Sequence, residues 1–220
     1  MKKRIIRELT LPIVLSILAV VLLVGRIFYT GELRFVFLVW NLFLAFIPYL
    51  FSVFALKHKE NHWRFWPLFG VWMLFFPNAP YILTYFIHLK YSTADTFMMD
   101  ISLIGIFSVL GLFLGALSLQ HIFISLKHHF SPAGSWGIVL GVILLSGIGI
   151  YLGRFIRWNS WDILHAPHLI LEDIWLLFRH PSEHVFAWKF SMVISMFIFV
   201  SLIIYQRFLS YVASKRAFFN

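Results

Sequence analysis

The chain has 220 residues, of which 61% are hydrophobic and only 12% are charged. Soluble globular proteins carry about 25% charged residues, so this composition excludes a soluble globule and indicates a polytopic membrane protein. The absence of cysteine excludes disulfide bonds, thiol nucleophiles and thiolate-bound metals. The net charge of +9 is typical of basic residues at the cytoplasmic ends of membrane helices. We expect no nucleic-acid partner, because no basic surface is free of the apolar segments.

Several apolar segments are long enough to cross a bilayer as helices, which takes about 20 residues. There are six of them, at about residues 11–28, 35–56, 65–87, 101–119, 135–153 and 190–208. No linker or repeat divides them, so the sequence predicts one all-α transmembrane domain over residues 1–220. In the last long loop, the apolar residues 167–178 carry only Glu172 and Asp173 as a polar stripe. This pattern predicts a short helix that lies in the membrane interface.

Charges and small residues indicate how the segments are arranged. Most Lys and Arg residues lie at the two termini and in the loops at 57–64 and 127–129, so the positive-inside rule places both termini in the cytoplasm, N-in and C-in. Arg26, near the end of the first segment, is expected to extend to the interface. Glycines four residues apart predict close helix packing in the fourth and fifth segments, namely Gly111 and Gly115, Gly137 and Gly141, and Gly149 and Gly153.

The third segment contains two prolines, Pro77 and Pro80, in its second half. Proline has no N–H to donate, and its ring clashes with the carbonyl four residues earlier. We therefore expect this helix to be broken near Asn78. Two interpretations stay open: a discontinuous helix that lines a binding site, as in transporters, or a simple kink in which Asn78 caps the second half-helix.

Unusual polar residues fall at the outer ends of the segments in this orientation. They are Asn41, Asn78, Tyr81, His88, Asp100, Arg154, Arg157, Asn159 and Asp162. This segregation predicts an outward-facing polar site. The midpoints of the segments, by contrast, lack Asp, Glu, Lys and Arg, which argues against a conventional proton-coupled transporter.

Arg154 and Arg157 are three residues apart and so share one helix face. Two neighbouring guanidinium groups suit a phosphate or carboxylate headgroup. We predict a ligand site formed by Asn41, Asn78, Tyr81, Arg154, Arg157 and Asn159, with His88, Asp100 and Asp162 as candidates for proton transfer. Two structural alternatives stay open: the arginines anchor the interface together with Trp158 and Trp161, or Arg154 forms a salt bridge with Asp100.

A metal site is not predicted. His165 and His168 follow Asp162 at a spacing seen in metal sites, but Pro167 interrupts any continuous helix through the pair. No other cofactor is expected either.

Three motifs in this chain, Trp40–Ala45, Phe76–Thr84 and Gly149–Asp162, resemble the bacterial membrane family catalogued as domain of unknown function 1361. The resemblance extends over roughly residues 35–208. It implies a multi-pass protein of the bacterial cytoplasmic membrane and implies no activity. In that family an Asp typically follows the Thr at the end of the second motif, where this chain has Tyr85, and Asp100 matches a second acidic position.

The leading functional hypothesis is an outward-facing site that binds an anionic lipid or a lipid-linked envelope intermediate. Whether the protein also modifies or moves that lipid is left open, and so is whether it is an enzyme. The alternative is a non-enzymatic membrane subunit or transporter component in which the same motifs serve helix packing. The expected partners are membrane lipids and a further membrane protein.

Overall fold

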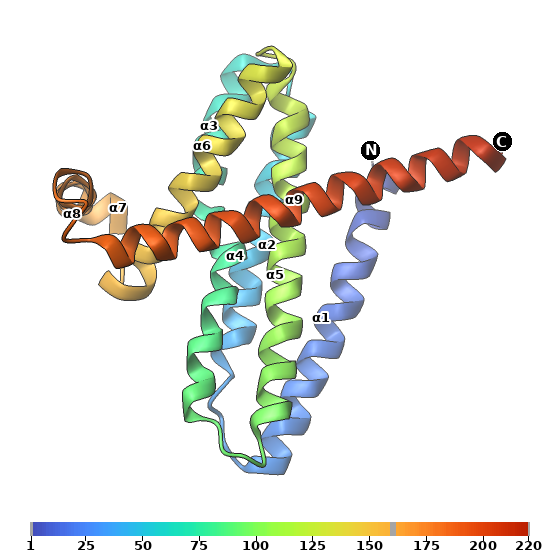
Figure 1. Cartoon of the computed structure of the whole chain (residues 1–220). Coiled ribbons are helices and arrows are strands. Elements are labelled where there is room, and N and C mark those ends of the chain that lie inside the picture. The colour runs from blue at the N-terminus through green and yellow to red at the C-terminus, as the bar shows by residue number, and fades with distance from the viewer. Residues whose placement is uncertain (1, 159–161, 220) are drawn as a thin grey trace.

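The structure is a computed structural model that describes residues 2–158 and 162–219, and every regular element in these residues is a helix (Figure 1). Among the described residues, six helical segments are long and apolar enough to cross a membrane. They are Glu8–Thr30, Phe37–Lys57, His62–Tyr91, Phe97–Leu126, Pro132–Ile156 and Val185–Lys215. The predicted all-α fold with six membrane-spanning helices is therefore confirmed, and the helices extend beyond most of the predicted ranges. The N-in, C-in orientation stays a prediction.

The first five spans run along a common long axis around a central helix. They are formed by α1 (Lys2–Thr30), α2 (Phe37–Lys57), α3 (His62–Phe75) with α4 (Asn78–Tyr81) and the 3₁₀ helix η1 (Ile82–Tyr91), α5 (Phe97–Leu126), and α6 (Pro132–Tyr151) with the π-helical turn η2 (Leu152–Ile156). Helix α5 packs against α1, α2, α4, η1 and α9 and is the most buried span. Its small residues Gly111 and Gly115 let α4 approach closely.

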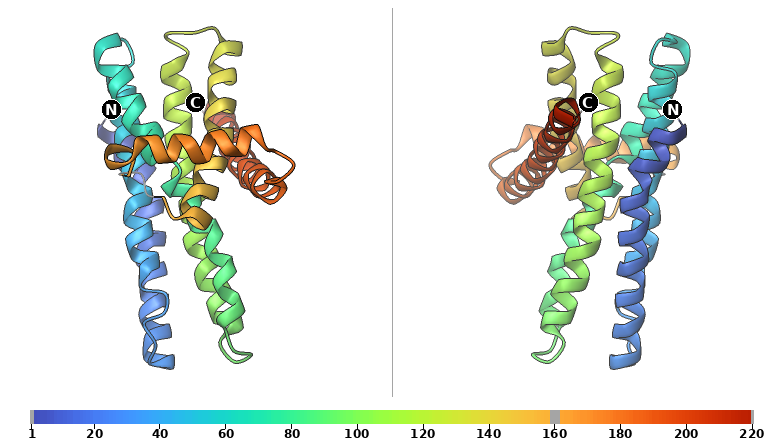
Figure 2. Two further views of the ribbon diagram at one scale, coloured as in Figure 1. Left: turned by 90° about the vertical axis from the view of Figure 1, so that its left-hand side faces the viewer. Right: turned by 90° about the vertical axis from the view of Figure 1, so that its right-hand side faces the viewer.

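The C-terminal part of the chain runs in a different direction. It comprises α7 (Asp162–His165), α8 (Pro167–Arg179) and α9 (Val185–Phe219). Both α8 and α9 lie across the long axis of the bundle, near the middle of its height (Figures 1 and 2). The predicted helix at 167–178 is thus present as α8, and it covers the side of the bundle rather than its end.

The third span is broken where its two prolines predict. Helix α3 is capped at its start by Asn61, whose side chain accepts from the Arg64 N–H, and it ends at Phe75. After Pro77 the chain continues as the single turn α4 and then as the 3₁₀ helix η1. The Asn78 amide donates to the Phe75 carbonyl at 3.0 Å, so this side chain satisfies a carbonyl at the end of α3. The break therefore places Asn78 and Tyr81 in a short turn of their own.

Two of the three glycine motifs are packing sites and one is not. A Cβ on Gly111 of α5 would collide with the Ala79 carbonyl oxygen of α4, far inside the 3.0 Å that a Cβ needs. Gly149 and Gly153, at the end of α6, lie against Pro77 and Tyr81. Gly137 and Gly141 have nothing within 4 Å of an added methyl group, so the expectation of close packing at this pair is wrong.

Replacing Gly147 by Ala should separate α6 from α9. The new methyl group would collide with the Ser191 carbonyl oxygen of α9 and with the Ser195 hydroxyl, which donates to the Ile143 carbonyl at 3.1 Å. Overpacking of this kind costs about 1–3 kcal/mol, which thermal unfolding in detergent would measure. The matched control is Gly141→Ala on the same helix, where the methyl group meets no neighbour. Equal unfolding temperatures for the two variants would contradict the described α6–α9 contact.

Candidate functional site

A pocket of about 500 Å³ lies between α2, the α3–α4 break and the end of α6, and residues of α7 and α8 complete its wall. Three residues of the predicted ligand site, Asn41, Asn78 and Tyr81, all line it. Tyr85, Ser146 and Trp158 add further polar atoms, and the rest of the lining is apolar, with residues such as Leu44, Met73, Ile150, Ile163, Ile170 and Ile174. The structure therefore gathers three distant sequence motifs around one cavity.

Local structure explains how these side chains reach the cavity. Asn41 donates to the Phe37 carbonyl of its own helix at 2.8 Å, which holds its amide against α2. Tyr81 ends the turn that the prolines create, and its carbonyl accepts from the Thr84 hydroxyl at 2.8 Å. The Tyr85 hydroxyl has Asn41 as a polar neighbour across the pocket.

Trp158, which follows η2, links helix α8 to the end of α6 beside the pocket. The Trp158 indole N–H donates to the Asp173 carboxylate at 2.6 Å, and this bond holds α8 over the end of α6. Ile170 and Ile174 line the cavity. On other parts of the same helix, Leu171 and Trp175 are 65% and 61% exposed, so α8 presents apolar side chains both to the pocket and outward.

Arg154 does not line the pocket itself; it is half-buried and lies against the pocket residue Tyr85 and against His88. Its Nη2 lies 3.0 Å from His88 Nε2, and its guanidinium carbon lies 5.1 Å from the centroid of the Tyr85 ring, which lines the pocket. Guanidinium nitrogens can only donate, so His88 Nε2 is the acceptor and its ring proton is on Nδ1.

Among the described residues, the positive charge of Arg154 has no acidic partner. The structure describes all nine Asp and Glu side chains of the chain, and none of them forms an ion pair with Arg154. Its neighbours are an aromatic ring and a neutral imidazole, both of which can accept from a cation. The site is therefore electropositive at the edge of an apolar cavity.

The remaining predicted residues lie elsewhere. Arg157 ends η2 in the left-handed conformation (φ 75°), with its N–H bonded to the Leu152 carbonyl. It is exposed and does not line the pocket. The single helix face expected for Arg154 and Arg157 is therefore interrupted by the helix end. Asp162 begins α7 beside the pocket residue Ile163 without lining the cavity itself, and Asn159 lies outside the described residues.

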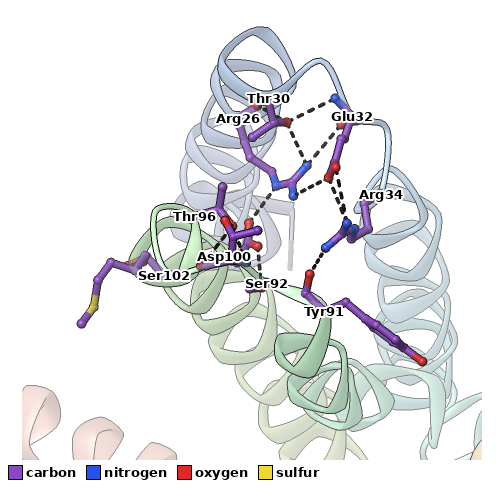
Figure 3. Close-up of polar contacts among 11 residues, drawn as sticks. Arg26, Thr30, Glu32, Arg34, Tyr91, Ser92, Thr96, Asp100 and Ser102 are labelled. Atoms are coloured by element: carbon purple, nitrogen blue, oxygen red, sulfur yellow. Dashed lines mark hydrogen bonds and ion pairs between the residues drawn. The ribbon is translucent and has the colours of Figure 1, made fainter.

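Asp100 belongs to a second polar cluster, at the end of the bundle where α1 meets α2 (Figure 3). Its Oδ1 accepts from Arg26 Nε at 2.8 Å and its Oδ2 accepts from the Ser92 hydroxyl at 2.6 Å. Arg26 also donates to Thr30 and Glu32, at 3.2 and 3.3 Å. The basic partner of Asp100 is thus Arg26 and not Arg154.

The expectation that Arg26 extends to the interface is wrong. The side chains of Arg26 and Asp100 are 1% and 0% exposed, so Arg26 is buried in the bundle. One signal in the sequence was available, because Arg26 precedes Thr30 and Glu32 by four and six residues, and these are residues that it contacts. Nothing in the sequence pointed to Asp100, which lies 74 residues away.

The family comparison covers most of the chain. The family described as "Protein of unknown function (DUF1361)" matches residues 40–218, a range that contains every residue of the pocket. No curated protein and no solved structure matches the chain. The protein is therefore a multi-pass membrane protein that belongs to the DUF1361 family.

Proposed function

We propose that the protein binds an anionic lipid, or a lipid-linked intermediate of the cell envelope, with the anionic headgroup at Arg154 and part of the apolar chain in the adjoining pocket. The observation that carries this proposal is the charge of Arg154, which is half-buried beside an apolar cavity and has no acidic partner among the described residues. A partly desolvated guanidinium group without a carboxylate favours an external anion.

The chemistry of the pocket supports a ligand with both polar and apolar parts. Ligand sites of about 300–1,000 Å³ are typically apolar with a few convergent polar groups, and this cavity of about 500 Å³ has that character. Asn41, Asn78 and Tyr81 offer uncharged donors and acceptors. The exposed apolar residues of α8 suit contact with the acyl chains of the membrane, so a lipid could enter beneath this helix.

A catalytic role would fall to His88 among the three predicted candidates. It is the titratable side chain in contact with Arg154, whereas Asp100 is fully engaged with Arg26 and Ser92. We assign the protein to the bacterial cytoplasmic membrane within the same proposal. The orientation with both termini in the cytoplasm belongs to the same proposal.

A second candidate function is favoured by the contact of Ala79 with Gly111. The same motif that supplies Asn78 and Tyr81 to the pocket also packs its backbone against α5. This dual role fits a non-enzymatic membrane subunit, in which the motif determines helix packing and the pocket holds a structural lipid.

Replacing Arg154 by Ala should lower the affinity for the lipid about ten- to a hundredfold, because charge-assisted hydrogen bonds contribute about 1.5–3 kcal/mol. Native mass spectrometry of the protein, extracted gently from its own membrane, would detect the wild-type adduct and identify the lipid. Arg207→Ala removes an exposed arginine of α9 and serves as the matched control. An adduct that survives Arg154→Ala would contradict the proposed headgroup site, and a wild type without any adduct would favour the packing role.

A further inference from the structure

A third buried polar cluster connects α1, α2 and α5 in the half of the bundle away from Arg26. His121 of α5 lies between two side chains: its Nδ1 is 3.1 Å from the Ser52 hydroxyl and its Nε2 is 3.2 Å from Glu8 Oε2. His121 and Ser52 are 2% and 0% exposed, and Glu8 is 15% exposed. The spans thus contain a titratable pair that the sequence pattern did not reveal.

The hydrogen bonds of Ser52 determine which nitrogen of His121 carries a proton. The Ser52 hydroxyl lies 2.7 Å from the Tyr49 carbonyl oxygen, and a carbonyl can only accept. The single hydroxyl proton is therefore directed at Tyr49, and Ser52 must accept from His121. It follows that Nδ1 of His121 is protonated.

A second proton must then lie between His121 and Glu8. Nε2 of an imidazole protonated only on Nδ1 is an acceptor, and a carboxylate oxygen is also an acceptor. Two acceptors at 3.2 Å repel each other unless a proton lies between them. Either His121 is an imidazolium beside a carboxylate, or Glu8 is a neutral acid that donates to the imidazole, and both forms hold one additional proton.

The surroundings disfavour a hydrolytic role for the same three residues. Ser52 is fully buried and its hydroxyl donates to a backbone carbonyl, so it is not available as a nucleophile. Among the described residues, the Tyr49 ring of α2 lies 5.8 Å from the His121 ring. Glu8 has a further interaction besides the one with His121.

We propose that Glu8 and His121 form a proton-binding site that attaches α1 to α5. Helix α1 packs mainly against α5, and among the described residues its buried ionisable links to that helix are the Arg26–Asp100 ion pair and the Glu8–His121 pair. Loss of the proton leaves two acceptors in contact and weakens the attachment of the N-terminal half of α1 to α5. The bound proton therefore stabilises this helix contact, independently of any lipid at Arg154.

The protonation of the two ring nitrogens of His121 can be measured directly. In the full-length protein in nanodiscs at about pH 8, where a free imidazole is neutral, ¹⁵N NMR of histidine-labelled protein reports which ring nitrogens carry hydrogen. The His121 signal is identified by its loss in His121→Asn. We expect Nδ1 to be protonated. A bare Nδ1 with a protonated Nε2 would overturn the proposal, because it would make Ser52 the donor to His121 and leave no additional proton.

A second measurement detects the additional proton of the Glu8–His121 pair through the pH dependence of the free energy of unfolding. Between about pH 8 and pH 9, Glu and His of the unfolded chain are almost fully deprotonated. A folded state that holds one proton therefore becomes less stable as the pH rises, and its unfolding constant increases up to tenfold per pH unit. Glu8→Gln should remove this dependence of stability on pH while keeping α1 in place, because the amide can donate to the neutral imidazole. His128→Asn changes an exposed histidine and should keep the wild-type dependence of stability on pH. Equal pH dependence of stability for wild type and Glu8→Gln would overturn the proposal. If the variant fails to fold, a wild-type stability that does not change over this pH range would overturn it as well.

Discussion

Replacing Asp100 by Leu should lower the free energy of unfolding by about 3–5 kcal/mol, the cost typical of removing one partner of a buried ion pair. The Arg26 guanidinium, 1% exposed, would keep Glu32, which is 48% exposed, as its one acidic partner among the described residues. The Ser92 hydroxyl would lose its acceptor as well. Chemical unfolding in mixed micelles would measure the loss.

The double variant Arg26→Met with Asp100→Leu should recover most of that stability, because exchanging a whole buried pair for apolar side chains is often neutral or stabilising. Asp95→Asn, at an exposed position of the neighbouring loop, is the control for loss of negative charge alone. If the double variant were as unstable as Asp100→Leu, the cluster in Figure 3 would have a role beyond pairing two buried charges.

Replacing Gly111 by Ala should both destabilise the protein and disturb the pocket. The added methyl group would collide with the Ala79 carbonyl oxygen and lie 3.2 Å from the Ile82 side chain, so the turn α4 must move away from α5. Overpacking costs about 1–3 kcal/mol. Because Asn78 and Tyr81 lie in that same turn, we also expect weaker lipid binding, measured by native mass spectrometry beside thermal unfolding.

Gly105→Ala on the same helix is the matched control. Nothing lies within 4 Å of a methyl group at Gly105, and Ala favours a helix over Gly by about 1 kcal/mol, so this variant should be as stable as wild type or more so. A Gly111→Ala protein with wild-type stability would contradict the close approach of α4 to α5.

The predictable part of the fold rests on properties of single residues and short segments. The spans follow from apolar runs without charges, and the break after Phe75 follows from the missing N–H groups of Pro77 and Pro80. The helix α8 follows from an apolar run that starts with Pro167. Each of these features depends on the covalent structure of single residues or on the transfer of a short apolar segment from water into lipid. None of them requires knowledge of residues far away in the chain.

Only part of the grouping expected for the candidate site could be predicted from the sequence. Asn41, Asn78 and Tyr81 share one pocket, because three spans that the family motifs mark converge there. The expected cluster of all outer polar residues is instead divided in two, since Asp100 pairs with Arg26 while Arg154 contacts His88. The contribution of α8 to the pocket wall was also not evident from the sequence. It depends on the hydrogen bond from Trp158 to Asp173, which forms only because α8 turns back over the bundle.

Sequence patterns alone were enough to predict six membrane-spanning helices, a break at the prolines of the third, and a resemblance to one membrane family. Which charges and hydrogen-bonding groups meet became evident from the three-dimensional packing. The partners Arg26 and Asp100, His88 and Arg154, and Glu8 and His121 lie 74, 66 and 113 residues apart. The physical reason is that a buried polar group must find a partner, but which partner it finds depends on the packing of apolar helices whose faces look alike in sequence.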